Sequence, residues 1–267
     1  MKNNKVIQIL CLMAVTTCLC FKSSGCGFDS GVSTGLKVLI SNNVVRAYYL
    51  KLPENYDSNT SYPLIFAFHG LFGDYTNFSD GLYDLQSVVG NEAILVYPNA
   101  LKDDSGVPGW NNYDLNFFDD LYRTLESNLS FDSGKVFAVG HSNGGFFAHV
   151  LGCQRGDLLR AIAPVAGYFP DYNNCTGQVA VLQIHGWNDE GISIMTAWIA
   201  LKNWVEINHC TKEETFEGAN LTCNSFGCDT GFPVHYCEHY EGHMWPGFAS
   251  DAIWTFFKSL PSTIPSD

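Results

Sequence analysis

The sequence predicts an α/β fold in which a mostly parallel central sheet is covered by helices on both faces. Short apolar runs that suit buried strands alternate along the chain with longer segments that suit helices. One stretch, Lys135 to His149, combines a strand, a glycine-rich turn and an apolar helix. Because a helix between two strands usually joins parallel neighbours, the repeated alternation favours a parallel sheet.

The first elements predicted are a hairpin and two buried strands. Gly35–Ile40 and Asn43–Leu52 alternate in a way that suits a β-hairpin at a sheet edge. Pro63–Phe68 and Ala93–Tyr97 are continuous apolar runs, which are typical of parallel strands buried on both faces. Between them, Phe78–Val89 is predicted to be helical.

The middle of the chain predicts a loop, an amphipathic helix and the strand–turn–helix unit. Leu101–Asn112 is rich in Asp, Gly, Pro and Asn and predicts a loop, and Asp114–Leu129 has one apolar helical face. Lys135–Val139 predicts a buried strand, and Phe146–Leu151 continues as a helix. The later predicted elements are strands Ala161–Val165 and Val179–Ile184, helix Ile192–Asn208, a cysteine-rich excursion Cys210–Cys237 with strand Pro233–Tyr240, and a helix from about Phe248 to Lys258.

The composition is that of a folded protein with an acidic surface. Hydrophobic residues make up 46% of the 267 residues and charged residues 15%. These values suit one large domain, which we expect to span residues 26–267. The formal net charge of −13 would repel nucleic acid and acidic membranes, so we expect neither as a partner.

Residues 1–25 have the features of a secretion signal. Lys2 and Lys5 give a positive start, Val6–Phe21 is mostly apolar, and Ser23–Gly25 supplies small residues for cleavage. No later segment is long and apolar enough to span a membrane, so we expect a secreted, extracellular protein with no integral membrane role. An uncleaved anchor is the alternative. A bacterial lipoprotein modified at Cys26 is a weaker one, because the preceding residues suit a lipobox poorly.

Cysteine usage also favours export. Of the ten cysteines, three lie in the presumed signal, and six remain for disulfides if Cys26 is lost or stays free. Six cysteines allow fifteen pairings. The pairing that we favour joins Cys153 to Cys175 and pairs the other four among themselves. These four, in a cysteine-rich insert at about residues 209–237, are Cys210, Cys223, Cys228 and Cys237.

Gly140 to Gly144 has the pattern G-x-S-x-G between a strand and a helix, the context that a nucleophile elbow requires. Ser142 would take a strained backbone conformation at the tip of this turn, so that its hydroxyl projects from the sheet. The N–H of Asn143 would then point at the oxygen that becomes negative during acyl transfer. A chance glycine-serine turn is the alternative.

A serine nucleophile needs a base, and the base needs an orienting acid. His243 is the best base, because it lies late in the chain, in a Gly-His-Met-Trp-Pro-Gly loop before the last helix. Asp189 is the best acid, because it closes a loop directly after an apolar strand, with Glu190 in reserve. The order Ser, Asp, His fits elbow-type sites. The histidines that we rank lower are His141, His149, His185, His209, His235 and His239.

A second oxyanion donor should come from the loop that follows Pro63–Phe68. We assign the backbone N–H of Leu71 in the His-Gly-Leu-Phe-Gly turn, with Phe72 in reserve. Together with Asn143, this group would hold the tetrahedral oxyanion.

Several motifs together resemble one family. The chain is similar to secreted α/β-hydrolases of the polyhydroxybutyrate depolymerase and feruloyl esterase type, over roughly Val44–Phe257. The matching motifs are His69-Gly70, Trp110-Asn111, Asp114–Phe118, Gly-His-Ser-Asn-Gly-Gly, Ala163–Gly167, His185-Gly-x-x-Asp189 and Gly242-His243-x-Trp-Pro-Gly. Trp187-Asn188 before the acid and the cysteine-rich insert depart from the pattern and leave the substrate open.

The resemblance implies the α/β-hydrolase fold and a triad of Ser142, Asp189 and His243. It also implies hydrolysis of feruloyl or acetyl esters of plant-wall polysaccharides, or of hydroxyalkanoate polyesters, without metal or cofactor. Trp110, Trp187 and Trp245 are candidate substrate-binding residues, since aromatic faces suit phenolic acids and sugar rings. Core packing is the alternative for each tryptophan. We expect an ester as substrate and a monomeric protein.

Three other interpretations stay open. A peptidase of the same fold would use the same triad, and an inactive binding protein could keep the scaffold without the chemistry. A zinc site could be built from the cysteines and histidines of the insert, but their spacing is loose and disulfides suit an exported chain better.

Overall fold

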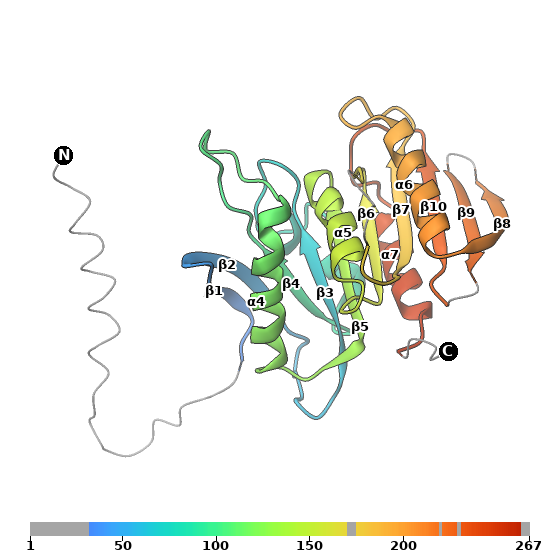
Figure 1. The fold of residues 1–267 in the computed structure, drawn as a ribbon. Coiled ribbons are helices and arrows are strands. Elements are labelled where there is room, and N and C mark those ends of the chain that lie inside the picture. Colours follow the sequence, from blue (N-terminus) through green and yellow to red (C-terminus); the bar gives the residue numbers. More distant parts are fainter. Residues whose placement is uncertain (1–31, 170–174, 219–220, 229–230, 263–267) are drawn as a thin grey trace, which may run out of the picture. The chain divides into compact units, whose positions relative to one another are not determined.

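A computed structural model describes residues 32–169, 175–218, 221–228 and 231–262. In this part of the chain the strands form one ten-stranded sheet in the order β1-β2-β4-β3-β5-β6-β7-β10-β9-β8 (Figure 1). The six central strands, from β4 to β10 in this order, run parallel to one another, whereas the pairs at both ends of the sheet are antiparallel. The predicted fold class is confirmed.

The hairpin predicted at the sheet edge is confirmed. Strands β1 (Gly35–Ser41) and β2 (Val44–Lys51) pair antiparallel, and β1 forms one end of the sheet. The turn residues Asn42 and Asn43 have φ values of 49° and 62°. Positive φ at both central residues matches the twist of a two-residue hairpin, and asparagine adopts it more readily than most residues.

The parallel strands coincide with the apolar runs of the sequence, because both faces of this region are covered. Prediction and structure differ most at β5, which begins four residues before the expected Lys135. There Phe131 pairs with Tyr62, and the register is irregular until Val136 pairs with Leu64. The parallel strands are β3 (Tyr62–Phe68), β4 (Ile94–Pro98), β5 (Phe131–His141), β6 (Ala161–Val165), β7 (Ala180–Gly186) and β10 (Val234–His239).

The single helix predicted for Phe78–Val89 is wrong. The segment forms two short helices, α2 (Thr76–Ser79) and α3 (Leu85–Val89). Gly81, with φ of 83°, lies between them in a conformation that no α-helix contains. The longer helices agree with prediction within a few residues: α4 (Leu115–Glu126), α5 (Asn143–Gln154), α6 (Ile194–Ile207) and α7 (Ala249–Ser259).

Helices cover both faces of the sheet. Buried side chains of α4, α5 and α6 pack in one hydrophobic cluster, and those of α3 and α7 pack in a second cluster on the other face. Figure 1 shows α4, α5 and α6 in front of the sheet and α7 behind it. Strand β5, which leads into the elbow, therefore lies in the middle of the core.

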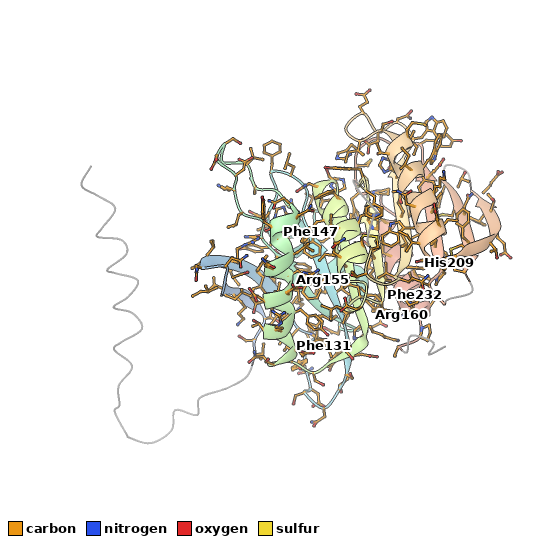
Figure 2. The ribbon with its side chains drawn as sticks, viewed as in Figure 1. Phe131, Phe147, Arg155, Arg160, His209 and Phe232 are labelled. Atoms are coloured by element: carbon orange, nitrogen blue, oxygen red, sulfur yellow. A yellow bond between two sulfur atoms is a disulfide. The ribbon has the colours of Figure 1, made fainter. Side chains whose placement is uncertain are left out.

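Two arginines tie separate elements together (Figure 2). Arg155, just after α5, forms two hydrogen bonds of 2.7 and 2.8 Å with the carboxylate of Asp119 on α4. Arg160 is buried and donates to the carbonyls of Pro261 and Gly231, at 3.1 and 3.0 Å. The first contact joins two helices of one face, and the second fixes the chain that follows α7.

The cysteine-rich excursion extends the sheet beyond β10. It forms β8 (Cys210–Glu217) and β9 (Leu221–Cys228), which the sequence had predicted only as an irregular insert. The predicted disulfide grouping is confirmed: Cys153 is bonded to Cys175, Cys210 to Cys228, and Cys223 to Cys237. Each of the last two joins residues that face one another on adjacent strands, so both hold the extension to the sheet. The zinc interpretation is wrong, because these four sulfurs are not free to bind a metal.

The predicted signal segment and Cys26 lie outside the described residues. Among the helices of the described ranges, none combines the length and the apolar character that crossing a membrane requires.

His149 is a buried titratable group in the centre of α5. Its Nδ1 accepts a hydrogen bond of 2.9 Å from the indole N–H of Trp204 on α6. Burial, and to a smaller extent the neighbouring His185, lower the pKa of His149 to about 3. The folded protein therefore holds this ring neutral under conditions that protonate the unfolded chain.

We predict that His149→Gln weakens the acid sensitivity of folding. The pKa of His149 is lower in the folded protein than its value of about 6.5 in the unfolded chain. Its contribution to the free energy of unfolding is therefore complete above pH 6.5 and is lost as the pH falls toward 3. Each such group contributes a slope of up to about 1.4 kcal/mol per pH unit to the free energy of unfolding. The substituted amide does not titrate and keeps an oxygen for Trp204. Urea unfolding between pH 7 and 4.5 should give a smaller slope for the variant, and equal slopes would contradict the assignment.

Candidate active site

The elbow lies where β5 ends and α5 begins. Ser142 has φ of 56° and ψ of −117°, a conformation that is strained for a residue with a side chain. Its N–H donates to the carbonyl of Val165 on β6, at 2.9 Å, which holds the turn against the neighbouring strand. The hydroxyl is thereby presented beyond the end of the sheet.

Glycine is required on both sides of Ser142. A Cβ at Gly140 would lie 2.2 Å from the carbonyl oxygen of Gly144, and one at Gly144 would lie 1.9 Å from that of Phe68. No side chain fits at such distances from backbone atoms. The close approach of strand, turn and helix is the physical reason for the G-x-S-x-G pattern.

His243 and Asp189 complete a hydrogen-bonded chain with Ser142. The Nε2 atom of His243 lies 2.8 Å from the Ser142 Oγ, and its Nδ1 lies 2.8 Å from Oδ2 of Asp189. Because a carboxylate can only accept hydrogen bonds, Nδ1 of His243 carries a proton and donates a hydrogen bond to Asp189. Nε2 can then accept a hydrogen bond from the Ser142 hydroxyl. The three side chains follow β5, β7 and β10, whose carboxyl ends lie at one edge of the sheet.

Asp189 is held in place by its own loop. Its Oδ1 accepts from the backbone N–H groups of Gly191 and Ile192, at 2.8 and 2.7 Å. The side chain is buried, whereas Glu190, the reserve candidate for the acid, is exposed. A Cβ at Gly191 would come within 3.0 Å of the His243 ring, so this backbone also packs against the imidazole.

Two contacts of the site were not predicted from the sequence. The buried His185 donates from Nε2 to the carbonyl of Ile192, at 2.8 Å, and the same nitrogen lies 3.3 Å from Oδ2 of Asp189. Burial is the main cause that lowers the pKa of His185, which keeps it neutral. Its position four residues before the acid is the signal that could have identified it.

His141 and Tyr83 form the second unpredicted contact. The Tyr83 hydroxyl lies 2.8 Å from Nδ1 of His141, whose ring centre is 5.2 Å from that of His243. Burial and then His243 lower the pKa of His141 to about 4. A neutral His141 therefore packs beside the base without adding a positive charge.

The loop after β3 lies against the nucleophile. A Cβ at Gly70 would lie 3.5 Å from the Ser142 Cβ. The N–H of Phe72 donates to the carbonyl of Pro108, at 3.1 Å, whereas the Leu71 N–H has no protein acceptor within the described ranges. Asn143 is the first residue of α5, where N–H groups have no carbonyl within the helix. Leu71 and Asn143 thus keep the free donors that the predicted oxyanion hole needs, and Phe72 does not.

Trp110 supports the site from within the core, which corrects its predicted role in substrate binding. The side chain is only 3% exposed, and its indole N–H donates to the His69 carbonyl, at 2.9 Å. Its backbone N–H donates to Oδ1 of Asn143, at 2.6 Å, and its carbonyl accepts from Nδ2, at 3.1 Å. These contacts hold the Leu101–Asn112 loop and the loop that carries Leu71 against the elbow.

Trp245 is also a core residue, contrary to its predicted role. It is 9% exposed, packs against Phe78 and Tyr83, and donates from its indole to Ser250 Oγ, at 3.1 Å. Of the three predicted tryptophans, only Trp187 presents an exposed ring. Other exposed apolar side chains that follow the parallel strands include Leu71, Phe72, Tyr168, Tyr240 and Met244.

Known proteins with related sequences are esterases. A probable feruloyl esterase C from Aspergillus niger is 30% identical over 270 residues, which cover 94% of this chain and 96% of that protein. Feruloyl esterase C from Emericella nidulans is 28% identical, with 89% and 91% of the two chains covered.

Solved structures with the same fold include esterases. An acetyl xylan esterase from Aspergillus awamori superposes with a TM-score of 0.65 at 16% identity and covers 84% of this chain and 99% of its own. A ferulic acid esterase from Anaeromyces mucronatus, in complex with ferulic acid, gives a TM-score of 0.58 at 17% identity, with 85% and 90% covered. At these identities the likeness establishes the α/β-hydrolase fold.

The family model described as putative esterase matches residues 43–215, a range that includes Ser142 and Asp189 and ends before His243. It covers well over half of the chain, and the relative from Aspergillus niger extends the likeness to nearly all of it. The chain therefore belongs to this esterase family and is a carboxylic ester hydrolase with the α/β-hydrolase fold.

Proposed function

We propose that this protein hydrolyses feruloyl or acetyl esters of plant-wall polysaccharides with Ser142, His243 and Asp189 as its catalytic triad. The observation that carries the mechanism is the unbroken hydrogen-bonded chain from Ser142 Oγ through His243 to Asp189. The names of the relatives, feruloyl esterases and an acetyl xylan esterase, support the substrate class.

In the first half of the reaction, the Ser142 Oγ attacks the ester carbonyl while His243 Nε2 takes its proton. Asp189 accepts the hydrogen bond of the Nδ1–H and stabilises the imidazolium that forms. The N–H groups of Leu71 and Asn143 donate to the oxyanion of the tetrahedral intermediate. His243 then protonates the alcohol oxygen as it leaves, and an acyl-serine remains.

In the second half, water takes the place of the alcohol. His243 removes a proton from the water as it attacks the acyl carbonyl, and the same two N–H groups stabilise the second oxyanion. The proton returns to Ser142 Oγ when the acid is released. Neutral His141 and His185 suit this cycle, because a fixed cation beside His243 would oppose its protonation.

We further propose that the enzyme is exported. The three disulfides support this, since such bonds persist in oxidising compartments. The hydrogen-bonded triad argues against an inactive binding protein on the same scaffold.

The triad assignment predicts that Ser142→Ala abolishes ester hydrolysis and that Asp189→Asn lowers kcat by about 10⁴-fold. The assay uses a short nitrophenyl ester, methyl ferulate, acetylated xylan, a hydroxybutyrate oligomer and a peptide amide. Glu190→Gln is the matched control, because it removes the adjacent exposed carboxylate and should leave kcat unchanged. Full activity of Ser142→Ala would refute the mechanism. Preferred cleavage of the oligomer or of the amide would refute the substrate class.

The Asn143 side chain offers a separate test of how the proposed oxyanion hole is held in position. Asn143→Ala keeps the backbone N–H but removes both bonds to Trp110, each worth about 0.5–1.5 kcal/mol. We expect the free energy of unfolding to fall by about 1–3 kcal/mol. Loss of a whole oxyanion donor lowers kcat by about 10²–10³-fold. Because Asn143→Ala keeps its backbone N–H, we expect its kcat to fall by only about tenfold.

Asn143→Asp is the second variant for this test. It keeps an acceptor for the Trp110 N–H but adds a negative charge beside the proposed oxyanion, so its kcat should fall further than that of Asn143→Ala. Methyl ferulate kinetics and urea unfolding measure both effects. Unchanged kcat in Asn143→Ala would mean that the Trp110 contacts do not position the loop.

A further inference from the structure

We propose that a groove beside the active site binds a neutral polysaccharide chain. This inference rests on the proposed function, because it identifies what holds the alcohol side of the same substrate. The groove runs from the end of β10 at Tyr240 along the face of the β8–β9–β10 extension that α7 borders.

Two neighbouring hollows form this groove on the α7 side of the sheet. The first is lined by His239, Tyr240 and Glu241. The second, of about 720 Å³, shares Leu221 and Phe248 with the first and lies between α7 and strands β8, β9 and β10.

The path begins at the loop that carries His243. Tyr240 and Glu241 are three and two residues before it. Because β9 and β8 continue the sheet antiparallel to β10 and to each other, the ends of β8 and β10 lie at the same edge. Phe216, near the end of β8, is two strands from β10, roughly 10 Å at the usual strand spacing. A chain bound along this path therefore starts next to the His243 loop.

The exposed side chains of the groove suit sugar rings. Tyr240 is 61% exposed and Phe216 66%. Aromatic faces present a large apolar surface to the C–H face of a sugar. Glu241 lines the first hollow and Glu214 the second. An ionised carboxylate only accepts hydrogen bonds, so it complements hydroxyl groups, which donate.

The charge of the groove selects an uncharged chain. Glu214 and Asp251 line the second hollow, and the whole protein carries a formal charge of −13. A polyanionic polysaccharide would be repelled. An apolar protein surface would bury these carboxylates without donors, which is costly. A neutral polysaccharide supplies both ring faces and hydroxyl donors.

The extension is rigid enough to hold Phe216 in a fixed position. The Cys223–Cys237 and Cys210–Cys228 bonds join β9 to β10 and β8 to β9. A surface that is ordered before binding loses less conformational entropy when the ligand arrives. The disulfides thereby connect the cysteine-rich insert to substrate binding.

The test measures polymer binding and small-ester turnover with the same variants. In the Ser142→Ala background, adding Phe216→Ala and Tyr240→Ala should reduce retention on insoluble neutral xylan at least fivefold. In the active enzyme, the same pair should leave kcat/KM for methyl ferulate within twofold and lower that for feruloylated arabinoxylan about tenfold. Val38→Ala is the matched control, since Val38 is also 66% exposed but lies on β1 at the opposite end of the sheet.

Three results would overturn the inference. They are unchanged xylan retention in the double variant, equal retention on anionic polygalacturonate, and a change from dimer to monomer on sedimentation of the double variant. Thermal unfolding of each variant verifies that the fold is intact.

Failure of the inference can be distinguished from failure of the proposed function. Methyl ferulate hydrolysis that depends on Ser142, without xylan retention, would overturn only the groove. Retention that depends on Phe216 and Tyr240, without any ester hydrolysis, would support the groove and refute the proposed reaction.

Discussion

A strained turn at Ser142 determines how the other parts of the site are arranged. Positive φ at a residue with a side chain is stable only where its surroundings hold it, and here the bond to Val165 and the packing at Gly140 and Gly144 do so. Since the carbonyls of Phe68 and Gly144 occupy the space of two missing Cβ atoms, β3, β5 and α5 must meet at one point. That meeting point brings the Leu71 loop next to the serine hydroxyl.

The hydrogen-bonded chain of Ser142, His243 and Asp189 depends on its neighbours, which either donate hydrogen bonds to Asp189 or are histidines that stay uncharged. Asp189 is fixed by two backbone donors, and His185 bonds to the same loop rather than competing for the carboxylate as a cation. His141 packs beside His243 with its pKa lowered by burial. The same condition that keeps these rings neutral makes the protein sensitive to acid, since the unfolded chain binds protons that the folded one excludes. Catalytic arrangement and pH-dependent stability thus share one physical cause.

The loops around the triad are supported by the core to different extents. Trp110 and Trp245 use their rings to stabilise the scaffold, so the surface near the triad is formed by residues that project from loops, such as Trp187 and Phe72. Beyond β10, disulfides replace a large core: β8 and β9 have helix α6 on one face and an open groove on the other. An insert of this kind can change the surface proposed to meet the substrate without moving the strands that carry the proposed triad.

The sequence by itself determined the parallel core strands and the turn at Ser142, and it led to the proposal of Asp189 and His243 as the partners of this serine, because continuous apolar runs and glycine spacing are local signals. Only the tertiary structure decided the break in the helix at Gly81, the pairing of β8 with β9, and the burial of Trp110 and Trp245. It also placed Tyr83 against His141 and His185 against the Asp189 loop. These features depend on contacts between segments far apart in the chain. A ring that packs in the core and a ring that faces the substrate look alike in sequence, and only the neighbours brought by folding separate them.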